Sequence, residues 1–486
     1  MDRKRNILLL VADDLGRYMG CCGAKDVDTP HLDELASQGT RFDMAFTSTA
    51  SCSGSRSVIY TGMHTHENGQ YGLNNNTHHF TTFGSVETAP KLFNSLGYQT
   101  GIIGKVHVGP EEAYPWETRE ESDSRNVAWV ADRAEAFFDK AKVSERPFFL
   151  TVGYVDPHRD RTRAGFGNDE VDDDRIQKVV YRPEDVEIPE FLSDLPEVRQ
   201  ELASYYQAIN RLDQGIGMIL ASLERSGLAE DTMVLFVSDN GPPFINSKTT
   251  LYDAGVRLPL LVKRPGGATR VVNPNMISFI DIVPTLLDWA GHPELIKGSR
   301  RGRSFLPIIE SEDQVEGWDR VFGSHTFHEV TNYWPTRYMR TRRYKYHRNI
   351  AWKLDFPFAA DLYGSLTWEG IRNSKPPMIG ARPLKSYLER PPEELYDLEA
   401  DPREVHNLAT NPQNADLLKE YRNATEAFQR ETNDPWLYRD GVSVALIQHH
   451  IDAGLEVPDR SDFNMEEPGN RDVLTLRSNE LFSPPA

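Results

Sequence analysis

Cysteine is scarce in this sequence. Three cysteines, Cys21, Cys22 and Cys52, occur among 486 residues, and two of them are adjacent. Three cysteines cannot form a disulfide framework, so packing of the core has to stabilise the fold. A chain of this length buries most of its apolar surface without cross-links.

Positive charge is also in short supply. Lysine and arginine number 54 against 73 aspartates and glutamates, and the formal net charge is -19. A field of this sign disfavours non-specific binding to nucleic acid and to anionic membrane surfaces, and we expect neither as a partner. It also repels anionic substrates, so a site for them needs cations close by.

Long hydrophobic runs are absent. The first apolar run, residues 7–12, follows basic residues but ends at two aspartates, and it is too short for a signal peptide. No later run reaches the roughly 18 apolar residues of a membrane-spanning helix. We therefore expect a cytoplasmic protein that does not cross a membrane.

The sequence does contain a repeated pattern of apolar runs that end in polar residues. Four runs, at 6–11, 100–107, 146–158 and 231–241, are typical of buried strands, with helix-like segments between them. This alternation predicts an α/β fold with a large, mainly parallel sheet flanked by helices. Ligands of such sheets bind at the carboxyl ends of the strands, where the polar residues would meet. These residues are Asp13, Asp14, Lys105, His107, Asp156, His158, Asp239 and Asn240.

Two pairs of oxygen-bearing residues among these predict a metal site. A single carboxylate after a strand often only caps the next helix. The adjacent Asp13 and Asp14 repel each other, however, unless a cation neutralises them. Asp239 and Asn240 add two more hard oxygen ligands, and no histidine or cysteine pair has zinc spacing. We expect Ca²⁺, which tolerates irregular geometry, with Mg²⁺ or Mn²⁺ as less favoured alternatives.

The segment SCSGSRS, residues 51–57, places Cys52 at or just before the start of a predicted helix. The helix dipole and Arg56 would stabilise an anion there. A lone cysteine is more often a small buried apolar residue, but the polar neighbours argue against that here. Lys105 and His107, two positions apart, point the same way if the chain is extended.

The run Cys52-Ser53-Gly54-Ser55-Arg56, followed by an apolar helix and Thr-Gly, resembles the sulfatase signature Cys-x-Pro-Ser-Arg. The blocks ADDLG, GTRF, TGIIGKVHVG, PFFLTVGYVDPHR, VSDNG and ELYDLEADPREVHNLA follow in the order usual for sulfatases. NGQYGL, GKVHVGPE, DPHR, FGSHTFHEVTNYWPTR and ETNDPW are similar to sulfamidases, the N-sulfoglucosamine sulfohydrolases. The resemblance implies an alkaline-phosphatase-like catalytic domain at 1–335. It also implies a smaller C-terminal domain at 336–486 with an antiparallel sheet and an extended tail.

The resemblance also implies a mechanism. In sulfatases the motif cysteine is oxidised after synthesis to formylglycine, whose hydrate attacks sulfur and later releases sulfate. Asp13, Asp14, Asp239 and Asn240 match the metal ligands of the family. The residues that match catalytic positions are Cys52, Arg56, Lys105, His107, His158 and Lys248, the last of which sulfamidases tend to replace with arginine. We expect Asp156 to bind the sugar or to orient His158. In the stretch that carries His325, His328 and Glu329, we expect at least one residue to bind substrate, with an ordinary loop as the alternative. The implied partners are a small sulfated saccharide or sulfamate, a formylglycine-generating enzyme and a second copy of the chain in a homodimer.

Gly54 is the departure from the signature, because the modifying enzymes read proline or alanine at this position. Glycine loosens a segment that proline would hold rigid. Two alternatives to a sulfatase therefore remain open. One is a phosphodiester or phosphonate hydrolase of the same superfamily, and the other is a non-catalytic binding protein in which Cys52 is not converted.

Overall fold

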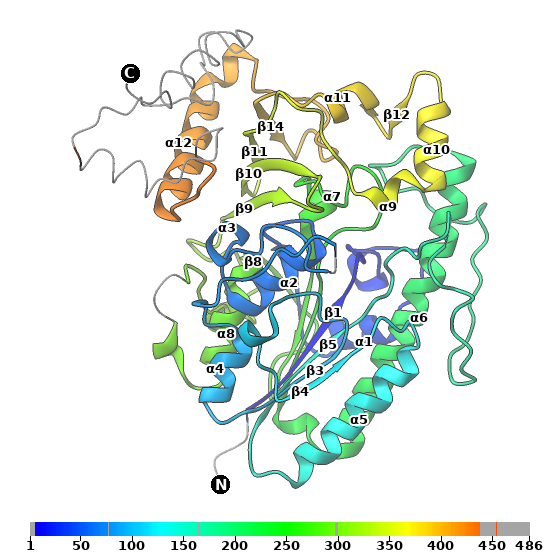
Figure 1. The fold of residues 1–486 in the computed structure, drawn as a ribbon, viewed down its shortest axis with the longest axis vertical. Coiled ribbons are helices and arrows are strands. Elements are labelled where there is room, and N and C mark those ends of the chain that lie inside the picture. Colours follow the sequence, from blue (N-terminus) through cyan, green and yellow to red (C-terminus); the bar gives the residue numbers. More distant parts are fainter. Residues whose placement is uncertain (1–4, 76, 164, 297–299, 438–452, 454–486) are drawn as a thin grey trace.

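A mixed sheet of eight strands forms the centre of the computed structural model, which describes residues 5–75, 77–163, 165–296, 300–437 and residue 453 (Figure 1). Neighbouring strands of this sheet run parallel except at β7, which is antiparallel to both β6 and β2. The expected large, mainly parallel sheet is confirmed. From edge to edge the strands are β4 (Thr118–Glu121), β3 (Gln99–Gly104), β5 (Phe148–Gly153), β1 (Asn6–Ala12), β6 (Thr232–Ser238), β7 (Arg257–Lys263), β2 (Thr40–Phe46) and β8 (Val271–Ser278).

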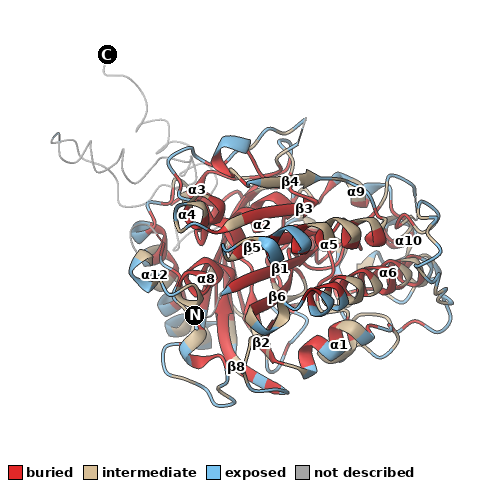
Figure 2. Ribbon diagram, turned by 90° about the horizontal axis from the view of Figure 1, so that it is seen from below, coloured by how far each residue is buried: buried red, intermediate tan, exposed pale blue. Residues whose placement is uncertain are grey.

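Helices cover both faces of this sheet, which explains the continuous apolar run of β1. Successive side chains of a strand point to opposite faces. Leu8 and Leu10 pack in one core cluster and Ile7 and Leu9 in the other, all of them fully buried. The central strands β1, β5 and β6 are coloured as buried in Figure 2. One face carries α1 (Pro30–Ser37), α5 (Val127–Val143) and α6 (Pro196–Ser226), and the other carries α2 (Cys52–Thr61), α4 (Ala89–Ser95) and α8 (Ile282–Trp289).

A separate antiparallel sheet of four strands lies over the end of the large sheet, next to α2 and α3 (Thr65–Asn68) (Figure 1). Its strands, in order, are β14 (Glu393–Asp397), β11 (Tyr344–Asn349), β10 (Tyr333–Thr341) and β9 (Arg320–Phe327). Helix α12 (Ala415–Glu431) packs on it through Leu418 and Tyr421, against Met339, Tyr346 and Leu395. The expected antiparallel sheet is confirmed, and it begins with β9, earlier in the chain than the predicted boundary at residue 336.

Short elements lie between strands of the two sheets, one of them between β6 and β7 and the others between β11 and β14. They are α7 (Asp253–Val256), α9 (Ala360–Tyr363), α10 (Leu366–Asn373), α11 (Leu384–Leu388), and the paired β12 (Met378–Ile379) and β13 (Arg382–Pro383). The predicted C-terminal tail, after about residue 438, lies outside the described residues. Within the described ranges, no helix combines the length and the apolar character needed to span a membrane.

Candidate active site

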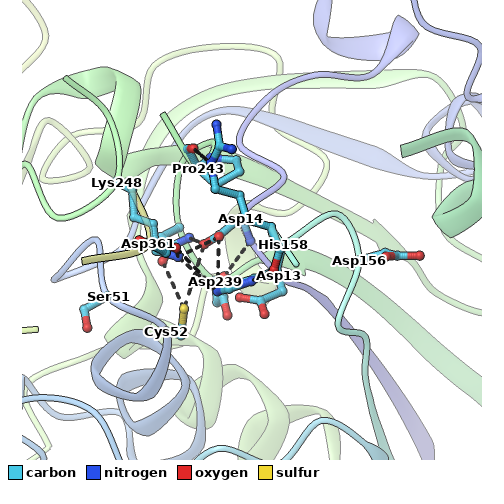
Figure 3. A network of polar contacts seen from close by, with 12 residues as sticks. Asp13, Asp14, Ser51, Cys52, Asp156, His158, Asp239, Pro243, Lys248 and Asp361 are labelled. Atoms are coloured by element: carbon cyan, nitrogen blue, oxygen red, sulfur yellow. Dashed lines mark hydrogen bonds and ion pairs between the residues drawn. The ribbon is translucent and has the colours of Figure 1, made fainter. Parts of the chain in front are cut away.

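Side chains with oxygen ligand atoms follow two central, neighbouring strands of the large sheet. Asp13 and Asp14 come directly after β1, and Asp239 and Asn240 come directly after β6. All four side chains are fully buried. One carboxylate oxygen from each of the three aspartates lies within 4.8 Å of the others (Figure 3). The structure therefore brings the four predicted metal ligands to one place.

These buried oxygens fit a hard divalent cation. Oδ1 of Asp13 is screened from solvent, yet it has no hydrogen-bond partner among the described residues. Burial, together with the nearby Asp13, raises the pKa of Asp239 to about 8. Carboxylates held this close in a dry site are stable together only when positive charge neutralises them. A donor set made of oxygen alone suits Ca²⁺ or Mg²⁺ better than a transition metal.

Each of the three carboxylates also pairs with a buried side-chain cation. These cations balance the charge of the three carboxylates, so the charge of a bound metal ion would remain available to an anionic substrate. The pairs are Arg56 Nε–Asp239 Oδ2 at 2.9 Å, Lys248 Nζ–Asp14 Oδ2 at 2.8 Å, and Lys105 Nζ with Asp13 Oδ2.

Cys52 is the first residue of α2 and faces this cluster. Its Sγ lies 3.8 Å from Asp14 Oδ1 and 3.7 Å from Asn240 Oδ1 (Figure 3). Burial raises the pKa of the thiol well above its usual value, and Asp13 and Asp14 add to the effect. The expected stabilisation of an anion at Cys52 is therefore wrong for the unmodified thiol, which stays protonated.

Arg56 does not compensate for this effect, because its guanidinium is already engaged. Besides the pair with Asp239, it donates hydrogen bonds to the backbone carbonyls of Lys105 at 3.0 Å and Tyr154 at 3.3 Å. The fully buried Arg56 thus joins the loops that follow β6, β3 and β5.

On the other side of Asp14, His158 and Lys248 form a hydrogen-bonded pair. The distance from Lys248 Nζ to His158 Nε2 is 3.1 Å. His158 Nδ1 lies 2.6 Å from the carbonyl oxygen of Arg159, which only accepts, so Nδ1 carries a proton. A neutral His158 therefore has its lone pair on Nε2, and the Lys248 ammonium donates to it. A substrate atom that takes the place of Lys248 at Nε2 can therefore exchange a proton with this pair.

Sequence reasoning missed one residue of this site, Asp361 of α9. Its Oδ2 lies 2.8 Å from Lys248 Nζ and 3.9 Å from His158 Nε2 (Figure 3). The segment around it carries no motif, and it follows Lys248 by 113 residues. Nothing local in the sequence could have identified it.

His107 lies beside the cluster in an uncommon backbone conformation. Its φ is +56°, and that of Asp14 is +59°. Residues other than glycine adopt this left-handed region rarely, and such positions collect at functional sites. Burial, reinforced by Lys105, holds the pKa of His107 well below its usual value. The imidazole is therefore neutral, and its Nδ1 has no hydrogen-bond partner among the described residues.

Asp156, expected to bind substrate, does not reach the site. Both of its carboxylate oxygens are taken by arginines, with Arg211 at 2.7 and 2.8 Å and Arg125 at 2.9 Å. The side chain is buried and points away from Cys52 (Figure 3). The sequence could not show this, because the two guanidiniums come from α6 and from the segment before α5, and neither arginine is adjacent to Asp156 in the chain.

The stretch around His328 approaches the start of α2, as expected. His328 Nδ1 is 2.9 Å from the Ser51 hydroxyl, directly before Cys52. Glu329 is partly exposed, and its carboxylate lies 4.0 Å from His78 Nε2. His325 instead pairs with the Thr49 hydroxyl at 2.7 Å. A contact of His328 or Glu329 with substrate stays a prediction.

Gly54 lies in α2 where a side chain has little room. A Cβ atom there would be 2.8 Å from Cγ2 of Thr49 and 3.3 Å from Cγ2 of Thr65. In this chain, two threonine methyl groups therefore pack close to the site that a residue larger than glycine would occupy.

Comparison with known proteins agrees with this geometry. The sulfatase family model matches residues 5–292, and the model of the C-terminal region of N-sulphoglucosamine sulphohydrolase matches residues 245–355. Human N-sulphoglucosamine sulphohydrolase is 40% identical over 471 residues, which cover 90% of this chain and 93% of the human protein. An ulvan-active sulfatase of Formosa agariphila is 29% identical, over 85% of this chain and 77% of its own.

Solved structures share the fold. One of them, determined in complex with its substrate D-glucosamine-2-N,6-O-disulfate, has a TM-score of 0.65 at 20% sequence identity and covers 89% of this chain and 99% of its own. The family match spans more than half of the chain and includes the strand ends and the start of α2 described above. The chain belongs to the sulfatase family.

Proposed function

We propose that this sulfatase removes the N-sulfo group from a glucosamine-like saccharide. The observation that carries the proposal is the 40% identity to human N-sulphoglucosamine sulphohydrolase over nine-tenths of the chain. The geometry supports it, because the Lys248–His158 pair lies beside the acidic cluster that Cys52 faces, and a leaving amine must gain protons.

In this proposal Cys52 is the precursor of formylglycine. The hydrated aldehyde would supply an oxygen nucleophile at the start of α2, where the thiol itself is buried and protonated. Asp13, Asp14, Asp239 and Asn240 would hold the metal ion, for which we propose Ca²⁺, and the ion would polarise a sulfo oxygen.

The chain's own residues then have separate tasks. Lys105 and Arg56 fix the carboxylates and provide positive charge beside Cys52. The neutral His107, next to Lys105, can accept a proton from a hydroxyl group on residue 52. His158 and Lys248 lie near Oδ2 of Asp14, whereas Cys52 lies near Oδ1. They deliver a proton to the leaving nitrogen.

Two measurements test the proposal. The rates on N-sulfoglucosamine, an O-sulfated glucosamine and a phosphodiester should differ, with N-sulfoglucosamine the fastest. A phosphodiester that reacts faster by orders of magnitude would instead make the protein a phosphodiesterase of the same superfamily. The mass of the tryptic peptide containing Cys52 should be about 18 Da below that of the unmodified peptide, as the change from CH2–SH to CHO requires. An unmodified peptide, with no hydrolysis of any substrate, would identify a non-catalytic binding protein.

A further inference from the structure

We propose that Asp361 makes the site selective for sulfur bound to nitrogen, because its carboxylate pairs with the amine that leaves. This inference rests on the function proposed above and names the residue that separates a sulfamate from a sulfate ester. Asp361 is supplied by the C-terminal part of the chain and lies against the Lys248–His158 pair (Figure 3).

The carboxylate of Asp361 is ionised and only half engaged. Burial would raise its pKa, but Lys248 and His158 outweigh burial and lower it. Oδ2 accepts a hydrogen bond from Lys248, whereas Oδ1 is screened from solvent and has no hydrogen-bond partner among the described residues. A buried anionic oxygen without a donor is costly unless a ligand supplies one.

Partial exposure marks the side from which a substrate reaches these groups. The side chains of Asp361 and His158 are 24% and 26% exposed, whereas Lys248 between them is 1% exposed and Cys52 is likewise buried. A sulfo group that reaches Cys52 therefore leaves its attached atom, and the sugar behind it, on the side of His158 and Asp361.

The fold holds Asp361 in place opposite His158 through a second buried ion pair. Arg159, the residue after His158, binds both carboxylate oxygens of Glu201 at 2.7 Å. The same carboxylate accepts the backbone N–H groups of Leu366 at 2.9 Å and Thr367 at 3.0 Å. These residues begin α10, only a few positions after Asp361. The loop that carries His158 and the segment that carries Asp361 are thus tied to one glutamate.

The chemistry of the two substrate classes differs where Asp361 lies. Hydrolysis of a sulfamate follows R–NH–SO₃⁻ + H₂O → R–NH₃⁺ + SO₄²⁻. The sulfur–nitrogen bond breaks, its electron pair stays on nitrogen, a sulfur–oxygen bond replaces it, and both protons of the water end on nitrogen. The nitrogen becomes positive as it leaves, so a carboxylate beside it stabilises the transition state and the product.

A sulfate ester makes the opposite demand. Its leaving oxygen gains negative charge as the sulfur–oxygen bond breaks, and it ends as a neutral alcohol. A carboxylate next to that oxygen gives no stabilisation and opposes the developing charge. Asp361 therefore favours nitrogen over oxygen at the position of the leaving atom.

The test is the ratio of kcat/KM for N-sulfoglucosamine to kcat/KM for 4-nitrophenyl sulfate, whose phenolate leaves without a proton. We expect Asp361→Asn, which keeps the shape and removes the charge, to lower this ratio about 10- to 100-fold, the effect of one hydrogen bond to a charged group. Asp397→Asn is the matched control, because Asp397 also pairs with a cation, Arg343 at 2.7 Å, but outside the site. It should leave the ratio unchanged.

The outcomes separate the two proposals. Equal losses on both substrates in Asp361→Asn would mean that the residue only supports Lys248, and would overturn this inference while the proposed function stands. Hydrolysis of 4-nitrophenyl sulfate by the same preparation shows that the variant is folded. A wild-type enzyme that cleaves 4-nitrophenyl sulfate but not N-sulfoglucosamine would refute the proposed function itself, and with it a nitrogen-selective role for Asp361.

Discussion

Replacing Gly54 with alanine tests how the start of α2 is packed. Alanine is the better helix former, and in an open helix the change would stabilise the protein by about 0.5–1 kcal/mol. Here the new Cβ would lie 2.8 Å from Thr49 Cγ2, well inside the optimal carbon–carbon distance of about 3.5–4.0 Å. Thr49 has to turn, or the helix has to shift.

Turning Thr49 has a cost that the structure makes visible. Its hydroxyl is paired with His325 Nδ1 at 2.7 Å, and both residues are buried. Loss of that hydrogen bond leaves buried polar atoms without partners, at a cost of about 1–3 kcal/mol. Subtracting the gain in helix propensity, we expect Gly54→Ala to lower the free energy of unfolding by about 0.5–2 kcal/mol.

Four proteins measured by urea unfolding decide the matter: wild type, Gly54→Ala, Thr49→Ser and the double variant. Serine keeps the hydroxyl that pairs with His325 and removes the Cγ2 carbon. In the Thr49→Ser background alanine should therefore become neutral or stabilising, which gives a coupling energy of about 1–2 kcal/mol between the two sites. The same cost in both backgrounds, or a more stable single variant, would refute this account. The mass of the Cys52 peptide is also measured in each preparation. It shows whether conversion of Cys52 to formylglycine depends on the residue at position 54 or on the stability of the fold.

Three further predictions concern the metal cluster, the Glu201 ion pair and the response to acid. Treatment with EGTA should lower both the hydrolysis rate and the unfolding temperature, because the buried carboxylates lose a neutralising charge. Ca²⁺ should restore both at a lower concentration than Mg²⁺. No change in either quantity would argue against a metal ion at this site. Glu201→Gln should destabilise the protein by roughly 3–5 kcal/mol in urea unfolding, because Arg159 and Glu201 are almost fully buried. As a control, Asp132→Asn breaks an exposed pair with Arg175 and should change stability by less than about 1 kcal/mol. Burial alone would raise the pKa of Glu394, but His347, Arg390 and Arg382 lower it from 4.5 to about 2. Because the pKa is lower in the folded state, this stabilisation is present above about pH 4.5 and is lost as the pH falls toward 2, so unfolding curves of Glu394→Gln should depend less on pH in that window.

Strand patterning predicted the sheet and much of the site because both follow from local chemistry. The apolar run of β1 has to be buried on both faces, and residues directly after it lie at the carboxyl edge wherever the sheet is parallel. That rule placed Asp13 and Asp239 together. It failed for Asp156, which also follows a strand, because the arginines that bind it come from other parts of the chain.

Asp361 shows the other limit of sequence reasoning. A side chain in a four-residue helix, in the part of the chain after the large sheet, reaches the site through tertiary contacts, among them the hydrogen bonds between the start of α10 and Glu201. No periodicity or spacing records that tertiary contact. The residues that sequence could not place are therefore those positioned by ion pairs between distant segments.

The balance of charge in the site explains how an acidic chain can bind an anion. Four carboxylates, those of Asp13, Asp14, Asp239 and Asp361, face three side-chain cations, Arg56, Lys105 and Lys248, in the pairs that the structure describes. With the carboxylates ionised, this set carries one net negative charge and would repel a sulfo group. A bound divalent cation makes the same set positive by one charge, which turns repulsion into attraction. Affinity for a sulfated substrate should therefore depend on occupancy of the metal site even before any chemical step, and the raised pKa of Asp239 reflects the same need for positive charge.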